Sequence, residues 1–295
     1  MSLLILSGLG FADTLSVADK RIQLTAGGRL QNVRATNYDA ATGAQTSAYD
    51  QDAFSPAFAL VFKPWRDVSI YGNWIQGLQP GEVVPAGFAN AGQAFAPYKA
   101  NQLEVGFKID WGKLTTTVSA FQITQPVAIV DTASNSYVPA GQQRNRGIEF
   151  NLFGEPTKGV RVLGGAMFLE PILTQTQDGL TDGWQAFGTP NVQVNLAGEW
   201  DVPFARGETV NGRMIYTGAQ YIDTSYPRRT IPDWARFDAG VRYTFDNAQS
   251  PTGKPVTLRL NAENLLGASY WATSFYGYLI QGAPRTFKLS ATASF

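Results

Sequence analysis

The stretch APRTFKLSATASF, residues 283–295, decides the fold class of this chain. From residue 287 onward, apolar and polar side chains alternate without a break: Phe287, Leu289, Ala291, Ala293 and Phe295 against Lys288, Ser290, Thr292 and Ser294. Successive side chains of a β-strand point to opposite faces of the sheet, so a period of two predicts a strand with one apolar and one polar face.

The same alternation recurs along the whole chain. It predicts a partial strand that ends near Leu15 and further strands at residues 22–31, 54–63, 68–77, 101–111, 114–130, 137–154, 160–168, 191–202, 209–221, 234–245 and 256–264. Residues 101–111 are the clearest case, with Leu103, Val105, Phe107 and Ile109 on one face and Glu104, Lys108 and Asp110 on the other. A register shift of one residue would put three charges on the apolar face, so the register is fixed.

The connections between the predicted strands alternate in length. Those after Lys63, Asp110, Gly154, Val202 and Phe245 are short, whereas those near residues 35–52, 78–98, 171–187, 220–231 and 265–282 are long. Short turns on one side and long loops on the other are typical of outer-membrane β-barrels, where the turns are periplasmic and the loops extracellular. Aromatic residues beside the short turns predict an interfacial girdle: Trp65, Trp111, Trp200, Phe204 and Phe245. A soluble β-sandwich is the alternative, since alternation alone does not separate the two.

Composition excludes several functional classes. Lys plus Arg and Asp plus Glu both number 23, and the basic residues are scattered, which argues against a nucleic-acid partner. The chain has 0 Cys and 0 His, so we expect neither a metal site nor the usual catalytic residues of a hydrolase. Glu104, Glu149, Glu199 and Glu263 face the polar side and could pair for acid–base catalysis, but a wet barrel lumen needs such residues in any case.

Membrane insertion, if it occurs, has to use strands. No apolar run reaches the length of about 18 residues that a membrane helix requires, whereas a closed barrel satisfies every backbone group between strands. The N-terminal stretch MSLLILSGLGFADTLS has a short apolar core with no Lys or Arg before it, unlike a secretory signal. We therefore interpret it as part of a strand that lies inside a longer barrel.

Several stretches resemble the barrel of TonB-dependent siderophore receptors. VTLRLNAENLLGASYW (256–271), followed after a loop by GAPRTFKLSATASF (282–295), resembles the C-terminal signature of that family. LGFADTLSVADKRIQLTAGGRLQ (9–31), QQRNRGIEFNLFG (142–154) and IPDWARFDAGVRYTF (231–245) resemble other parts of the same barrel. A last strand that ends in Phe also resembles the strand by which the barrel-assembly machinery recognises outer-membrane proteins, so we expect Phe295 to act as an assembly signal.

The resemblance implies an all-β fold, an antiparallel transmembrane barrel portion of roughly 12 to 13 strands out of about 22 in a complete plugged transporter. Residues 1–295 would be the C-terminal part of this barrel, without the family's plug domain and its segment for contact with the TonB complex. The implied function is uptake of a ferric siderophore across the Gram-negative outer membrane, with the iron chelate as transported ligand and no cofactor held by the protein. The other implied partner is outer-membrane lipid.

The long loops carry the candidate ligand-binding residues. Outer-side aromatics hold the ferric chelate in siderophore receptors, and cations assist with anionic chelates, so the resemblance points to a group in the last loops: Trp184, Tyr221, Tyr226, Arg228, Arg229, Phe275 and Tyr276. The alternative for the aromatics among them is an upper interfacial girdle or loop packing. Two other functions remain open: a self-sufficient small barrel that acts as a passive pore or adhesin, and an outer-membrane enzyme, which the lack of His disfavours.

Overall fold

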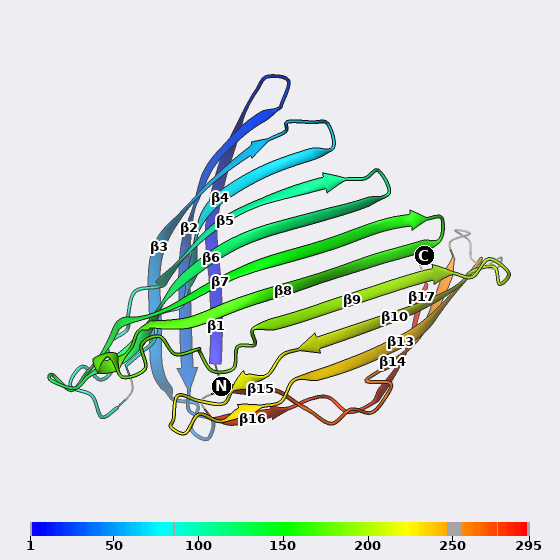
Figure 1. The fold of residues 1–295 in the computed structure, drawn as a ribbon. Helices are drawn as coiled ribbons and strands as arrows, with labels where there is room; N and C mark the ends of the chain where they lie inside the picture. Colours follow the sequence, from blue (N-terminus) through cyan, green and yellow to red (C-terminus); the bar gives the residue numbers. More distant parts are fainter. Residues whose placement is uncertain (1, 85, 247–254, 276, 294–295) are drawn as a thin grey trace. The chain divides into compact units, whose positions relative to one another are not determined.

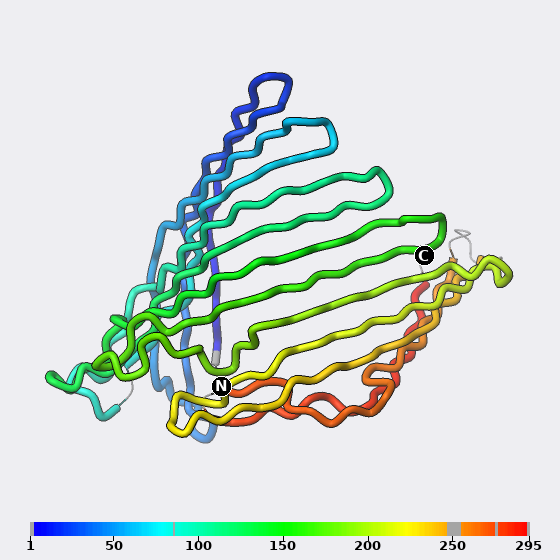
Figure 2. Tube along the Cα trace, viewed as in Figure 1, coloured from blue at the N-terminus to red at the C-terminus, as the bar shows by residue number. Residues whose placement is uncertain are grey.

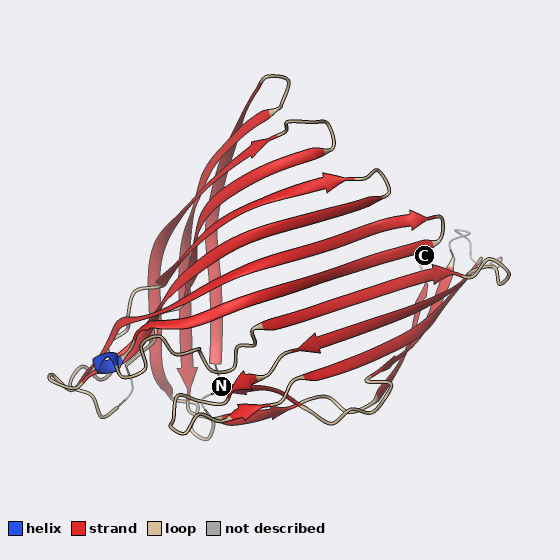
Figure 3. Ribbon diagram, in the orientation of Figure 1, coloured by secondary structure: helices blue, strands red, loops and turns tan. Residues whose placement is uncertain are grey.

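The computed structural model of the chain describes residues 2–84, 86–246, 255–275 and 277–293. Nearly all regular structure in these residues is β-strand, as Figure 3 shows, and a short 3₁₀ turn at Gln177–Gly179 is the helical element described. None of the described helical structure is long and apolar enough to cross a membrane.

Thirteen strands form a single sheet in the order β1-β2-β3-β4-β5-β6-β7-β8-β9-β10-β13-β14-β17 (Figure 1). They are β1 Ser2–Val17, β2 Ile22–Tyr38, β3 Gln45–Phe62, β4 Val68–Gln79, β5 Tyr98–Asp110, β6 Leu114–Asp131, β7 Ser136–Thr157, β8 Val160–Gln175, β9 Val192–Asp201, β10 Glu208–Thr217, β13 Trp234–Phe245, β14 Val256–Glu263 and β17 Thr286–Ala293. Two small hairpins lie in the connections, β11 Gln220–Tyr221 with β12 Thr230–Ile231, and β15 Trp271–Phe275 with β16 Tyr278–Gln281. The all-β antiparallel fold and the strand number expected from the sequence are confirmed.

One predicted connection is wrong. Residues 35–52 were expected to form a long loop, but β2 and β3 stay paired as far as Tyr38 and Gln45, which leaves residues 39–44 as the turn (Figure 2). Asp39 closes this turn, because its carboxylate accepts hydrogen bonds from the backbone N–H groups of Ala41 and Thr42 at 2.9 and 2.7 Å. The strands are longer here because polar side chains pair across them, as in Asn37 to Ser47 at 2.9 Å.

The chain divides into two compact units. The first comprises Met1–Phe107, Ser119–Gly147 and Glu170–Gln185, and the second comprises Lys108–Val118, Ile148–Leu169 and Ala186–Phe295. Within each unit, the strands present an apolar face and a polar face, as the alternation in the sequence predicts.

Strand register in the second unit sorts apolar and polar residues into separate rows. One row across the sheet is entirely apolar: Val160, Trp200, Val210, Val241, Leu260 and Leu289. The next row on the opposite face is Arg161, Glu199, Asn211, Gly240, Asn261 and Lys288. A side chain at Gly240 would force its neighbours to shift, because a Cβ atom there would lie 2.9 Å from the backbone carbonyl oxygen of Leu260 and 2.1 Å from Oδ1 of Asn261. Five of the six apolar side chains, all except Val160, are exposed, which is the arrangement of a sheet whose apolar face meets lipid.

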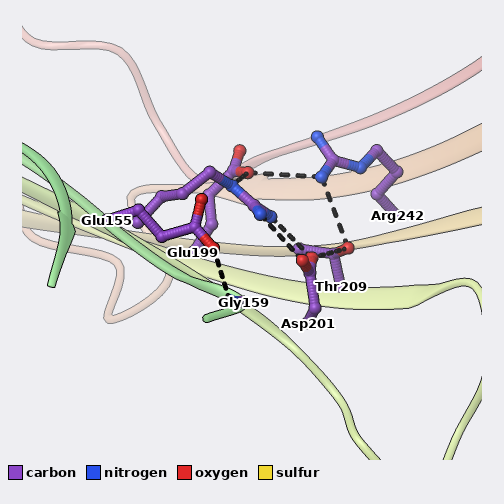
Figure 4. A network of polar contacts seen from close by, with 7 residues as sticks. Glu155, Gly159, Glu199, Asp201, Thr209 and Arg242 are labelled. Carbon is purple, nitrogen blue, oxygen red and sulfur yellow. Dashed lines mark hydrogen bonds and ion pairs between the residues drawn. The ribbon is translucent and has the colours of Figure 1, made fainter. Parts of the chain in front are cut away.

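A charged network crosses the polar face near the short turns of the second unit (Figure 4). Arg161 donates two hydrogen bonds to the carboxylate of Asp201, at 2.7 and 2.5 Å, and a third to Glu199 at 3.1 Å. Arg242 reaches Glu199 and the hydroxyl of Thr209, and Thr209 donates to Asp201 at 2.7 Å. Bidentate Arg–carboxylate geometry adds direction to these contacts, so the network holds the ends of β8, β9, β10 and β13 in register.

Candidate functional site

The long connections of the second unit fold together into one cluster. The loop cluster, as we call it, consists of residues 186–189 with the hairpins β11–β12 and β15–β16. Gly188 donates its N–H to the carbonyl of Tyr221 at 2.9 Å, and the hydroxyl of Thr273 donates to the carbonyl of Gly188 at 3.2 Å. Ala186, Gln220, Ile231 and Ser274 are buried within it. These loops therefore pack against one another and do not extend separately into solvent.

Asn264 fixes the base of the last long connection. Its side chain is only 1% exposed, and its Nδ2 donates to the carbonyls of Ala268 and Ala283 at 2.8 and 3.1 Å. Its Oδ1 accepts the N–H of Ala268, and its own N–H donates to the carboxylate of Asp238 at 2.8 Å. The residue has a φ of 52°, a left-handed conformation that Asn tolerates better than most residues. Both ends of residues 264–285 are thus tied to one side chain.

Four of the predicted ligand-binding residues lie in or beside the loop between β11 and β12: Tyr221 at the end of β11, and Tyr226, Arg228 and Arg229 on the loop itself. The guanidinium carbon of Arg228 lies 3.6 Å from the ring centroid of Tyr221, a cation–π contact. Arg229 forms an ion pair with Asp223 of the same loop. Tyr226 precedes the two arginines in the same loop and is 87% exposed. The loop therefore presents an exposed aromatic ring beside two arginines whose positions are fixed.

We expect this loop to open at acid pH, when the carboxylate of Asp223 is protonated. The pKa of Asp223 lies below its usual value, first because the N–H of Ser225 donates to its carboxylate at 2.9 Å and then because Arg229 pairs with it. A lowered pKa stabilises the folded loop above the unfolded value of about 3.9 and stops doing so as the pH falls through the folded value. We expect a spin label at Tyr226→Cys, in a chain with 0 Cys, to stay immobile from pH 8 to about pH 4 and to become mobile only as the pH falls further, through the lowered pKa of Asp223. With Asp223→Asn added, the label should be mobile throughout; a label with one mobility at every pH in both proteins would contradict the pair's role.

The other predicted site residues are not brought to this loop by any described contact. Trp184 lies in the first unit, in the connection after β8, where its carbonyl accepts the N–H of Leu173 at 2.9 Å. The backbone of Phe275 pairs with Tyr278 in the hairpin β15–β16. Tyr276 and the expected assembly signal Phe295 lie outside the described residues.

Sequence reasoning missed a second loop site, in the first unit. Residues 80–84 and 86–97 fold over the polar face of β2 and β3 around Val84, Phe95 and Tyr98, which are buried. Tyr49 accepts the N–H of Gly81 at 3.1 Å, and Tyr137 donates its hydroxyl to Glu82 at 2.5 Å. Beneath lies a depression of about 840 Å³, large enough for a drug-sized ligand. Its aromatic residues, three of them between positions 88 and 98, were the signal available in the sequence.

The carboxylates that could have formed a catalytic pair are separately partnered. Glu104 accepts from Tyr71 and Gln102, Glu149 from Asn151, Glu199 from Arg161 and Arg242, and Glu263 from Lys288. Within the described ranges, no group of three acidic side chains is placed to hold a metal ion. The side chains of the polar face are paired as donors and acceptors, as expected for the water-filled lumen of a barrel.

Comparison with protein families decides what this sheet is. Residues 7–265 match the model of the β-barrel of TonB-dependent receptors. The chain belongs to this family. The ferrichrome receptor FcuA of Yersinia enterocolitica is 37% identical over 98% of the chain, and the ferrichrome outer-membrane transporter and phage receptor of Escherichia coli K12 is 26% identical over 93%. The chain spans 38% and 36% of the lengths of these two relatives.

Solved structures of TonB-dependent receptors carry the same sheet. BauA, the ferric preacinetobactin receptor of Acinetobacter baumannii, superimposes with a TM-score of 0.79 at 39% identity, over 98% of this chain and 43% of BauA. The siderophore receptor PiuA of the same organism superimposes with a TM-score of 0.76 at 21% identity, which shows the shared fold. The family and the barrel fold expected from the C-terminal signature are both confirmed.

Proposed function

We propose that residues 1–295 form one continuous stretch of barrel wall in an outer-membrane receptor that takes up a ferric siderophore. The observation that carries this proposal is the separation of apolar and charged residues into alternate rows, as in Val160 to Leu289 against Arg161 to Lys288. A sheet of this kind is stable where one face meets lipid and the other meets water. The relatives named as ferrichrome and ferric preacinetobactin receptors support the choice of ligand class.

The loop cluster of the second unit would receive the chelate, at the ends of its strands opposite the short turns. An iron chelate is then a transported ligand, released after it crosses the membrane through the barrel interior. The energy would come from the TonB complex, and assembly into the membrane would use the barrel-assembly machinery. Because each of the four carboxylates is paired with another polar side chain, the proposed binding and transport involve no catalytic step.

Uptake of radioactive iron tests the proposal. The full-length protein, with whatever segments flank these residues, is expressed in a strain that lacks its own receptors and is supplied with ferric hydroxamate and ferric catecholate chelates. We expect uptake of at least one chelate, dependent on the TonB complex. Uptake that persists without TonB would favour a passive pore, and absence from the outer-membrane fraction would remove the proposal.

Arg228 offers a sharper test of the ligand site. We expect Arg228→Ala to weaken binding of an anionic ferric chelate at least about 10-fold, because a charge-assisted hydrogen bond contributes about 1.5–3 kcal/mol. Binding of an uncharged chelate should change less than 3-fold on the same scale. Arg66→Ala, in the short connection after β3, is the matched control and should leave both affinities unchanged. Equal losses for charged and uncharged chelates would show that Arg228 acts through loop packing instead.

A further inference from the structure

The hairpin β11–β12 is too short to fix its own orientation. It is built from two residue pairs, Gln220 with Ile231 and Tyr221 with Thr230. A two-stranded hairpin by itself is at best marginally stable in water. Its loop nevertheless carries an exposed aromatic ring and the two arginines of the candidate ligand site. Other contacts therefore have to hold these side chains in place.

The two faces of this hairpin have different surroundings. Gln220 and Ile231 lie opposite each other on one face, and each is only 2% exposed. Successive residues of a strand point to opposite faces, so the side chain of Tyr221 lies on the other face, where Arg228 stacks on its ring. The contacts of the buried face therefore determine the direction in which Tyr221 and Arg228 point.

Gln220 is the polar side chain of the buried face, and it bonds to the second hairpin of the loop cluster. Its Nε2 atom donates to the carbonyl of Ala272 at 3.2 Å. Its Oε1 atom accepts from the hydroxyl of Thr273 at 3.0 Å, and the same hydroxyl lies 3.2 Å from the carbonyl of Gly188. One buried amide thus connects the hairpin β11–β12 with β15 and, through Thr273, with residues 186–189.

Two neighbouring contacts support the same junction. The hydroxyl of Ser274, which is 4% exposed, donates to the carbonyl of Ile222 at 2.6 Å. A Cβ atom at Gly188 would clash with the carbonyl oxygen of Ser274, so these two loop segments approach each other at backbone distance. Buried groups that lose a hydrogen-bond partner cannot turn to water instead. The orientation of the hairpin β11–β12 therefore depends on these bonds, and Gln220 makes bonds through both ends of its amide.

We propose that Gln220 is a positioning residue, which holds Tyr221 and Arg228 in the orientation that receives the chelate. This inference rests on the proposed function, which places ligand binding at the loop cluster. A site that is correctly oriented for only a fraction of the time has an apparent affinity reduced by that fraction, and its association rate falls in the same proportion. Its dissociation rate stays the same, because the bound loop has its normal geometry. A residue that contacts the ligand acts mainly on the dissociation rate instead.

Binding kinetics of the full-length receptor test this role. Association and dissociation rates are measured in detergent by stopped-flow fluorescence with an anionic ferric tris-catecholate chelate. We expect Gln220→Leu, which keeps the bulk of the side chain and loses both hydrogen bonds, to slow association about 10-fold and to change dissociation less than about 3-fold. Arg228→Ala should mainly speed dissociation. Thr209→Val, at a residue that is 5% exposed and lies near the short turns, is the matched control and should change neither rate.

A rescue that depends on pH identifies the hydrogen bonds as the cause. Gln220→Glu keeps the shape of the side chain, but the introduced carboxyl group can donate to Ala272 only while it is protonated. Burial raises the pKa of this carboxyl group, so it is protonated at about pH 5 and ionised at about pH 8. We expect a spin label at Tyr226→Cys in this variant to be immobile at the lower pH and mobile at the higher pH. With Gln220→Leu the label should be mobile at both.

Each outcome decides between the explanations. An unchanged association rate in a folded Gln220→Leu protein, or a label that is immobile at both pH values in Gln220→Glu, would overturn the positioning role. Faster dissociation with unchanged association would make Gln220 a ligand contact instead. The label reports the position of the loop without any ligand. A wild-type receptor that binds no chelate, while the label responds to both variants, would therefore contradict the proposed function but not the role of Gln220 in holding the loop.

Discussion

Phe107→Arg should destabilise the barrel by about 2–4 kcal/mol, because it puts a guanidinium group into the middle of the lipid-facing surface. Phe107 lies on β5 between Val105 and Ile109, and its side chain is exposed on the apolar face. The measurement is the free energy of unfolding by denaturant, with the protein folded into lipid bilayers.

Lys108→Arg is the matched control for this experiment. Lys108 lies on the polar face, where its Nζ atom is 5.9 Å from the ring centroid of Phe153, a contact that Arg can also make. We expect a change within about 0.5 kcal/mol, as for most surface substitutions. If the two variants lost the same stability, the assignment of the faces would be wrong.

Asn264→Ala should produce the second large effect, a loss of about 2–4 kcal/mol. Two carbonyls and one N–H would lose their partner where the side chain of Asn264, only 1% exposed, now fills the space, and a buried unpaired group costs about 1–3 kcal/mol. Ala also tolerates the left-handed backbone less well. We expect weaker chelate binding as well, since the hairpin β15–β16 of the loop cluster lies within residues 264–285. Denaturant unfolding and chelate titration measure the two effects.

Two further substitutions distinguish the loss of the hydrogen bonds from the effect of the left-handed backbone conformation. Asn264→Gly relieves the backbone conformation but removes the same hydrogen bonds, so it should lose nearly as much stability as Asn264→Ala. Asn135 also has a left-handed backbone, with a φ of 47°, but it is exposed, and Asn135→Ala should cost about 1 kcal/mol or less. A small effect at both positions would mean that the base of the loop is held by other contacts.

The fold could be predicted because the alternation of side chains is a local property. Leu103 to Ile109 and Phe287 to Ala293 each show it within one strand, and the rows of the sheet follow once neighbouring strands pair in antiparallel register. The connection at residues 35–52 was predicted wrongly for a related reason. Its residues are polar on both faces, and the cross-strand hydrogen bonds that extend β2 and β3 depend on residues from the partner strand.

The candidate sites were predictable only in part, for the same reason. The grouping of Tyr221, Arg228 and Arg229 could be expected, because they lie within one short loop. The site under residues 80–97 could not, since Tyr49, Glu82 and Tyr137 come from three separate parts of the chain.

The sequence by itself determined the strand number, the two faces and the family, because each depends on residues that are close together in the chain. The tertiary structure alone decided which side chains meet across strands: Arg161 with Asp201, Asn264 with the two ends of its loop, and Arg146 with Gln122. Those contacts depend on register and on how long loops fold back. Both are set by pairing between segments that lie far apart in the sequence, where no local pattern specifies the partner.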